Sequence, residues 1–308
     1  MAGVLIGFAI IAAVVVVGIV VGRSGVLGEQ GRVVLGRFAF FVASPCLLFT
    51  TLAEADVRTL FSGILVVSVL SALAVAAVYL VLALTVLRLR GPDAVIATMS
   101  SSYVNAANIG IPVAAYVLGD PALSAPVILF QVVIVTPIVL ILLDAMERGS
   151  VSVRRVLTSV VRNPIVLASF VGVVVAVLEL PVPDAVLEPF RLVGAAAVPV
   201  VLISFGMAIG DQRPLAPGSG RAAILTASLL KLLLMPVVAW LLGDLVFGLA
   251  PRELFVVVAL AALPTAQNVF NYAQRYGRGE VIARDVVLIT TVSSLPVMML
   301  VATLLAPV

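Results

Sequence analysis

Two apolar stretches of this chain each contain a short cluster of amides, hydroxyls and prolines. The first reads Ser-Ser-Tyr-Val-Asn-Ala-Ala-Asn-Ile-Gly-Ile-Pro at 101–112, and the second reads Leu-Pro-Thr-Ala-Gln-Asn-Val-Phe-Asn at 263–271. Amide side chains donate hydrogen bonds to an anion without adding a buried charge. Prolines interrupt helices, and the N-terminus of a new helix presents unpaired N–H groups and a partial positive charge. These clusters therefore predict a binding site for a small anion.

The alternative is that the two clusters are helix kinks whose polar side chains only hold neighbouring helices together. Two breaks at matching depth in two apolar segments favour a site, because paired interruptions mark the substrate site in many transporters. The predicted substrate-binding residues are Asn105, Asn108, Ile109, Gly110, Pro112, Pro264, Thr265, Gln267, Asn268, Asn271 and Lys231.

Lys231 lies near the middle of its own apolar segment, too far from either end to extend its ammonium to water. An ion at that depth costs about 2.5–3.5 kcal/mol and is a functional candidate. It either pairs with an anion or moves with the carrier, or else it is a fixed counter-charge for carbonyls at the broken helices. Other polar residues that could line the cavity are Ser44, Thr50, Gln131, Thr136 and Ser204.

Composition excludes several other chemistries. The chain has no histidine and one cysteine, which excludes His-ligated metals, His-dependent triads and internal disulfides. Asp144, Glu179, Asp211 and Asp285 all lie near segment ends, which argues against a paired-carboxylate cation site. The only lysine belongs to no P-loop, which excludes an ATP-driven pump. The sequence also lacks the basic cluster with interleaved aromatic residues that is typical of nucleic-acid binding. We expect neither an enzyme nor a metal site nor a bound cofactor.

The elements that must position these residues are membrane helices. With 63% hydrophobic and 11% charged residues in 308, lipid is the solvent that fits, and about 20 apolar residues are needed for each crossing. Continuous apolar runs predict ten transmembrane helices, over 2–21, 33–52, 60–87, 94–118, 123–143, 164–180, 187–209, 222–242, 254–276 and 281–306.

Basic residues alternate between the loops on the two sides. Arg58, Arg191 and Arg252 fall on one side, and Lys231 is inside a span. The positive-inside rule assigns the arginine-rich side to the cytoplasm and both termini to the outside of the inner membrane. The arginine-rich side holds Arg23, Arg32, Arg37, Arg88, Arg90, Arg148, Arg154, Arg155, Arg162, Arg213, Arg221, Arg275, Arg278 and Arg284.

Short motifs recur at a nearly constant separation along the chain. Ser-Pro-Cys-Leu-Leu at 44–48 resembles Val-Pro-Val-Val-Leu at 198–202, and Thr-Pro-Ile-Val at 136–139 resembles Leu-Pro-Val-Met at 295–298. Asn108 and Asn268 repeat in the same way. Since each unit holds five helices, the two halves must be inverted. The predicted units are 1–146 and 164–308, joined by a short cytoplasmic linker at 147–163.

The motif Asn-Ile-Gly-Ile-Pro at 108–112, and Pro-Thr-Ala at 264–266 followed by Ala-Gln-Arg-Tyr-Gly at 273–277, resemble the two crossover motifs of the auxin efflux carrier family. That family includes PIN-type auxin exporters and bacterial malonate/malate permeases. The resemblance implies a fold similar to bile-acid symporters and sodium/proton antiporters, with crossed broken helices 4 and 9. It also implies a scaffold of helices 1, 2, 6 and 7 and a mobile domain of helices 3–5 and 8–10. The long PIN loop and the second crossover proline are absent, so auxin is not inferred.

From the resemblance we expect an elevator-type secondary carrier for small organic anions, mainly carboxylates. The alternatives are an anion channel or uniporter, and a sodium-coupled symporter of the bile-acid type. Export down an inside-negative potential needs no coupling, whereas uptake needs a cation such as Na⁺ or H⁺. The expected partners are the anion and membrane lipid, with a homodimer through the scaffold helices by analogy and no nucleic acid.

Overall fold

A computed structural model of the chain describes residues 2–28, 30–54, 63–148, 158, 161–208, 214–216 and 219–306. The predicted beginning of the third span at Leu60, the end of the seventh at Ile209 and most of the linker at 147–163 lie outside the described residues. So do four of the loop arginines: Arg58, Arg154, Arg155 and Arg213.

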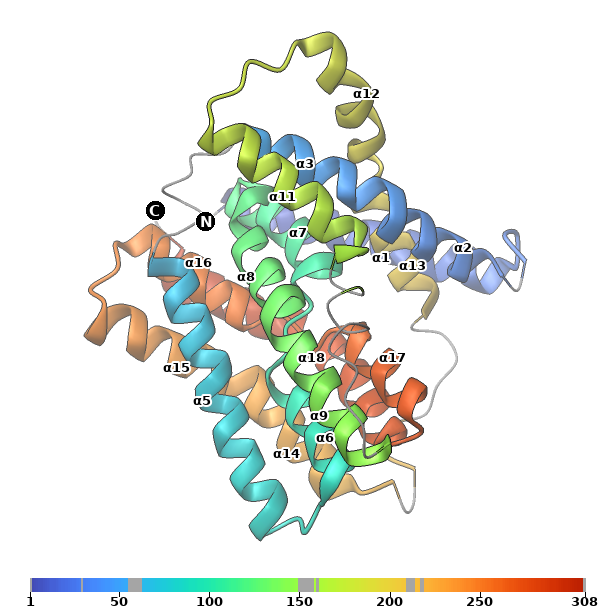
Figure 1. Cartoon of the computed structure of the whole chain (residues 1–308), viewed down its shortest axis with the longest axis vertical. Helices are drawn as coiled ribbons and strands as arrows, with labels where there is room; N and C mark the ends of the chain where they lie inside the picture. Colours follow the sequence, from blue (N-terminus) through green and yellow to red (C-terminus); the bar gives the residue numbers. More distant parts are fainter. Residues whose placement is uncertain are drawn as a thin grey trace.

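The N-terminal part of the chain is helical wherever it is described, except for short connections (Figure 1). The label η marks short π-helical turns within these runs, except that η4 is a short 3₁₀ helix. The elements are α1 (Ala2–Ser24), α2 (Gly31–Phe38), η1 (Ala39–Ala43), α3 (Ser44–Ala53), α5 (Gly63–Thr85), α6 (Gly91–Ser102), η2 (Ala106–Gly110), α7 (Ile111–Val113), η3 (Ala114–Leu118), η4 (Pro121–Ser124), α8 (Ala125–Phe130), η5 (Gln131–Val135) and α9 (Thr136–Arg148).

The C-terminal part is built in the same way. Its elements are α11 (Pro164–Val177), α12 (Asp184–Ala195), α13 (Ala197–Ala208), α14 (Arg221–Leu229), η6 (Leu230–Leu234), α15 (Met235–Leu241), η7 (Leu242–Val246), α16 (Pro251–Ala261), α17 (Gln267–Tyr276) and α18 (Glu280–Leu305). Its helix ends follow local signals. The Asn163 side chain accepts from the N–H of Ile165 at the start of α11, and Gly277 ends α17 with a positive φ of 64°.

Six helical runs among the described residues are long and apolar enough to cross a membrane: Gly31–Ala53, Gly63–Thr85, Pro121–Glu147, Asp184–Met207, Arg221–Val246 and Glu280–Leu305. Shorter apolar helices cover Ala9–Ser24, Ala106–Leu118 and Pro164–Val177. The chain is therefore an all-helical membrane protein with multiple apolar helices. The predicted spans overlap helical runs, with differences of a few residues at their ends and with interruptions inside 94–118 and 254–276; the number of crossings stays a prediction.

One set of helices packs at very short range through glycines, and we call it the glycine-packed group: α1, α2, α3, α11, α12 and α13. α1 lies along α13, and a Cβ on Gly18 or Gly206 would collide with the backbone of the opposite helix. Likewise, a Cβ on Gly172 of α11 would meet the carbonyl oxygen of Phe49 at 2.8 Å, and one on Gly194 of α12 would meet Leu47 Cα at 2.9 Å. Small residues allow this close approach, which maximises van der Waals contact between helices in lipid.

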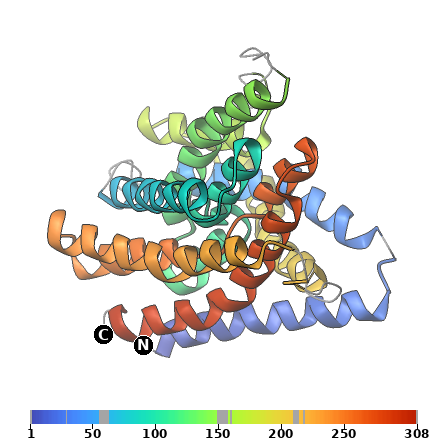
Figure 2. The same cartoon turned by 90° about the horizontal axis from the view of Figure 1, so that it is seen from below.

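The remaining helices form a second set, the crossover group: α5, α6, α8, α9 and α14 to α18, with the turns between them. α5 packs on α6, α15 and α16, and α18 packs on α6, α14, α16 and α17. The buried Tyr79 hydroxyl donates to the Ala223 carbonyl oxygen at 3.1 Å and joins α5 to α14. α18 extends from this group so that its last turns lie beside the first turns of α1, at the edge of the molecule (Figure 2).

Candidate functional site

The site begins where two helices of the crossover group stop. α6 ends at Ser102 and the helix resumes at Ala106, while α16 ends at Ala261 and α17 begins at Gln267. Near the end of α6, the hydroxyls of Ser101 and Ser102 both donate to the Thr98 carbonyl oxygen. Such serine-to-backbone bonds compete with the regular helix. At the second break, Pro264 disfavours helical geometry at Leu263.

The two breaks cross and pair with each other as a single antiparallel bridge between Val104 and Thr265. The Asn105 N–H donates to the Pro264 carbonyl oxygen at 2.8 Å, and the Ala266 N–H donates to the Tyr103 carbonyl oxygen at 3.0 Å. Backbone groups inside an apolar bundle must find partners within the protein. Each break therefore supplies the partners that the other one lost when its helix stopped.

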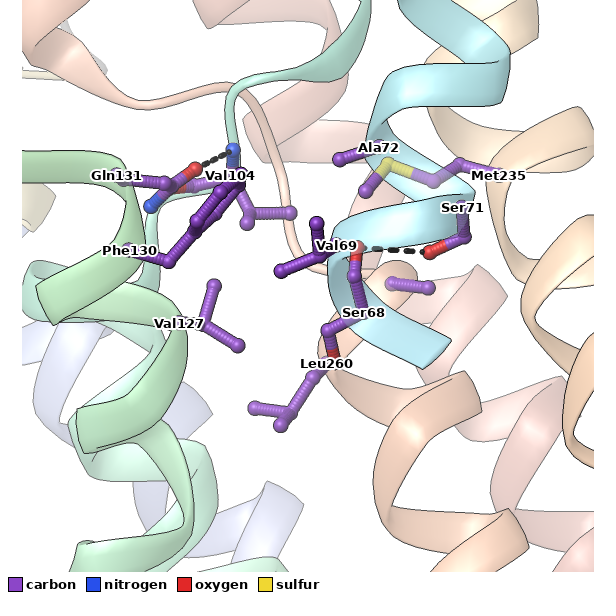
Figure 3. A pocket seen from close by; sticks show the side chains of 11 residues that line it. Ser68, Val69, Ser71, Ala72, Val104, Val127, Phe130, Gln131, Met235 and Leu260 are labelled. Carbon is purple, nitrogen blue, oxygen red and sulfur yellow. Dashed lines mark hydrogen bonds between the residues drawn. The ribbon is translucent and has the colours of Figure 1, made fainter. Parts of the chain in front are cut away.

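Gln131 satisfies the opposite side of the same bridge. Its Oε1 accepts from the Val104 N–H at 2.7 Å, and its Nε2 donates to the Val104 carbonyl oxygen at 3.0 Å. Figure 3 shows this side chain reaching from η5 to the backbone of Val104. The adjoining cavity is about 10 Å³ and holds no more than a water. The Gln131 amide thus makes the two hydrogen bonds with Val104 that a neighbouring strand would make, and it fixes the backbone of the first break.

The carbonyl ends of the two stopped helices also have partners. The Lys231 ammonium, fully buried, donates to the Ala261 carbonyl oxygen at 2.8 Å, at the last residue of α16. The Thr265 hydroxyl donates to the Ser100 carbonyl oxygen at 2.6 Å, and the Thr265 N–H donates to Thr290 Oγ1 at 3.1 Å. The partial negative charge at both helix C-termini is thereby matched by donors.

The opposite ends of the breaks, the two new helix N-termini, meet at a small pocket. Asn105 caps the first, with Oδ1 accepting from the Asn108 N–H at 3.2 Å, and Gln267 opens the second. Both are N-termini of helical runs, so their N–H groups carry partial positive charge. The pocket volume is about 30 Å³. Its lining contains the amide side chains of Asn105, Asn108, Gln131, Gln267 and Asn268 and no charged side chain among the described residues.

Not every predicted site residue lines this pocket. Of the predicted set, Asn105, Asn108, Gln267 and Asn268 line it, together with Gln131 from the wider cavity set. Pro264 and Thr265 form the crossing behind it, and Lys231 holds Ala261. Ile109, Gly110 and Pro112 are buried in the packed core after the first break, where the Gly110 N–H donates to the Asn105 carbonyl oxygen at 2.9 Å. Asn271 is exposed on α17 and absent from the lining.

The remaining hydroxyl candidates have other surroundings. Thr50 donates back to the carbonyl oxygens of Cys46 and Leu47, both at 3.1 Å, and Ser204 donates to the Arg32 carbonyl oxygen at 3.4 Å. Ser44 is buried at the start of α3. None of the three is in the described lining. Thr136 is also outside it but contacts Tyr103, whose hydroxyl lies 3.0 Å from Thr136 Oγ1.

Sequence reasoning missed the aromatic and apolar part of the lining. Tyr103 begins the first break, and Phe40 of η1 and Ile165 of α11 reach the same pocket from the glycine-packed group. Tyr103 could have been found from its place between Ser102 and Asn105. Phe40 and Ile165 carried no signal, because apolar side chains in apolar helices are indistinguishable until packing brings one of them to a pocket.

Comparison with known proteins finds one family and one relative of this chain. The sequence model of the family described as membrane transport protein matches residues 4–302. A protein of Rhizobium meliloti (strain 1021) named "Putative malonate transporter" is 25% identical over 267 residues, which cover 84% of this chain and 82% of the relative.

Proposed function

The chain belongs to the membrane transport protein family, which contains the auxin efflux carriers, and on this basis we propose that it is a secondary carrier of small carboxylates. It is a membrane transporter and not an enzyme.

The observation that carries the carboxylate proposal is the convergence of two helix N-termini on one amide-lined pocket. The N–H groups at the starts of η2 and α17, and the side chains of Asn108, Gln267 and Asn268, all lie around it. Helix N-termini attract anions through their dipoles and unpaired donors. The described lining offers no carboxylate to bind a cation instead. A carboxylate group is the small organic anion whose two oxygens suit several N–H donors at once.

The proposed architecture is ten transmembrane helices in two inverted five-helix repeats, 1–146 and 164–308, joined at 147–163. Supporting this, the two breaks occur in corresponding places of the two halves and cross in opposite directions. The proposed orientation puts both termini outside the cytoplasmic membrane, because the arginine-rich loops alternate with arginine-poor ones.

The proposed mechanism is an elevator, in which the crossover group moves along a static glycine-packed group. The close glycine contacts support a rigid scaffold, since such packing tolerates little sliding. The pocket lies at the boundary, with Phe40 and Ile165 on one side and the crossover residues on the other. At about 30 Å³ it admits one or two water-sized groups, so a dicarboxylate must bind when the two groups are farther apart. An alternating-access carrier has such a second state, in which the pocket is wider.

Ligand-induced thermal stabilisation tests the proposal. We expect malonate, and not matched organic cations, to raise the Tm of the purified protein. Asn108→Ala and Asn268→Ala should each raise the half-maximal malonate concentration by about tenfold, because each removes a hydrogen bond to a charged group. Asn271→Ala is the matched control, an amide on the same helix as Asn268 that does not line the pocket, and it should respond like the parent.

Three outcomes separate the alternatives. A Tm response that is equal in all three variants would place the anion outside the crossover pocket. A response to cations alone would end the anion proposal. A malonate response that appears only with sodium would favour the sodium-coupled symporter, whereas one that is independent of sodium would favour a uniporter or proton coupling.

A further inference from the structure

A second and larger pocket lies next to the crossover site. Its volume is about 300 Å³, and its lining includes Arg32 of α2, Phe205 of α13, Gln267 of α17, and Arg284, Thr291 and Ser293 of α18. It therefore lies between the glycine-packed group and the crossover group. Figure 2 shows α17 and α18, at the red end of the chain, facing the blue α2 and the yellow α13. All its charged lining residues among those described are arginines.

The charge of this pocket is positive after internal pairing is counted. Arg284 donates to Asp285 Oδ1 at 2.8 Å, and the second oxygen of this fully buried carboxylate accepts from the Leu215 N–H at 2.8 Å. Asp285 thus neutralises Arg284, and both of its carboxylate oxygens have partners. Arg32 is exposed and has no ion-pair partner among the described residues. One uncompensated positive charge is left at the pocket, together with the guanidinium N–H groups of Arg284 that Asp285 does not use.

An unpaired polar atom adds a second indication of a ligand. Thr291 is 5% exposed, and its Oγ1 has no hydrogen-bond partner among the described residues although it is buried. Buried hydroxyls in folded proteins nearly always have partners, so an unpaired one next to a cavity indicates a water or a ligand there. A threonine hydroxyl, like an arginine guanidinium, can donate a hydrogen bond to an anion.

Gln267 connects the two pockets. It is the first residue of α17, and it lines both the 30 Å³ crossover pocket and the 300 Å³ pocket. We propose that the larger pocket is an anion vestibule in which Arg32, Thr291 and Arg284 bind a carboxylate before Gln267 receives it at the crossover. The link to transport rests on the proposed function, whereas the anion preference of the vestibule itself does not.

Cysteine reactivity measures this preference without any assumption about the substrate. Cys46 is the only cysteine, so Cys46→Ser gives a thiol-free background, and Ser293→Cys then places one reporter thiol in the pocket. The reagents are an anionic and a cationic methanethiosulfonate of similar size. We expect the anionic reagent to react faster. Arg32→Gln should lower the ratio of anionic to cationic rates by about tenfold, because a charged cleft concentrates counter-ions locally.

Arg37→Gln is the matched control. Arg37 is an exposed arginine on the same helix as Arg32, but its side chain does not line the pocket. It should leave the ratio unchanged. Thr291→Val should abolish protection of the reporter thiol by malonate while the rate ratio stays as in the parent, because it removes a hydroxyl and no charge.

The inference is overturned if the reporter thiol reacts with neither reagent, if the two rates are equal in the parent, or if Arg32→Gln and Arg37→Gln change the ratio alike. A normal ratio without any protection by malonate has a different meaning. It keeps the anion vestibule and counts against malonate-like carboxylates as the substrate class.

Discussion

At the scale of single residues, the crossing depends on three side chains that bind backbone. The Gln131 side chain hydrogen-bonds both the N–H and the carbonyl oxygen of Val104. The Thr265 hydroxyl donates to the Ser100 carbonyl oxygen, and the Lys231 amine donates to the Ala261 carbonyl oxygen. Each sits where a helix has stopped and left N–H or C=O groups without partners. A buried backbone group without a partner costs about 1–3 kcal/mol, so these three contacts make the breaks tolerable in an apolar bundle.

The contacts of Lys231 favour the counter-charge alternative over the others. Its ammonium donates to the end of α16, where the helix dipole is negative, and the residue is fully buried and absent from the described pocket linings. The geometry therefore supports a structural role for Lys231, which stays a prediction. The Lys231→Met variant tests whether Lys231 also pairs with the anionic substrate.

Lys231→Met is expected to lower the Tm of the unliganded protein, because it leaves the Ala261 carbonyl oxygen without its donor at a cost of about 1–3 kcal/mol. The malonate concentration that gives half-maximal stabilisation should not change. Thermal melts at increasing malonate concentration measure both quantities on one sample. A variant with parental Tm and no malonate response would show that Lys231 pairs with the anion.

At the scale of elements, glycines determine which helices pack closely. Gly18 and Gly206 face each other between α1 and α13, and Gly172 and Gly194 bring α11 and α12 onto α3. In the crossover group, a Cβ on Gly63 of α5 would meet the side-chain end of Leu249, and one on Gly243 of η7 would first meet the side-chain end of Leu254. The group that we propose to be static is therefore the one with backbone-to-backbone packing.

Gly206→Ala is expected to destabilise the protein by about 1–3 kcal/mol, because the added Cβ would overlap the Val15 carbonyl oxygen and force α1 and α13 apart. Gly36→Ala is the control in the same group, since its Cβ would find only Ser204 Oγ at 3.6 Å. Thermal or denaturant unfolding in detergent compares the two. Equal stability in both variants would mean that the α1–α13 contact is not tightly packed.

At the scale of the whole molecule, the proposed orientation in the membrane rests on the arginines. Arg23, Arg32, Arg88 and Arg90 lie at helix ends and loops of the side that the positive-inside rule assigns to the cytoplasm, and the few basic residues on the other side include Arg191 and Arg252. In this proposed orientation the proposed vestibule opens on the cytoplasmic side, because Arg32 and Arg284 belong to the arginine-rich set.

A C-terminal fusion to alkaline phosphatase should be active in cells, and the same fusion to green fluorescent protein should be dark, because phosphatase folds only outside the cytoplasm. Fusions placed after residue 148 should give the reverse result. Enzyme activity and fluorescence of the four fusions are compared at equal expression. A fluorescent full-length fusion would reverse the proposed orientation and would put the vestibule outside.

Part of the site could be predicted because local sequence determines it. Pro264, the serines at the end of α6 and the capping Asn105 stop and restart helices by short-range chemistry, so the positions of both breaks follow from the residues themselves. The same holds for Asn108, Gln267 and Asn268, which are at or next to the new N-termini and therefore line the pocket. Asn271 was predicted with them but does not line the described pocket, because four residues of helix separate it from the N-terminus of α17; its role in substrate binding stays a prediction.

The amino-acid sequence was sufficient to identify the solvent, the helices and the breaks. Apolar runs reflect the thickness of lipid, and helix interruptions follow from proline and polar side chains at fixed positions. Which groups meet became visible only in three dimensions. The Val104–Thr265 bridge and the Gln131 and Lys231 contacts join residues far apart in the chain, and Arg32 and Arg284 line one pocket. Such contacts depend on how apolar helices pack, and many packings bury the same apolar surface, so hydropathy alone cannot select among them.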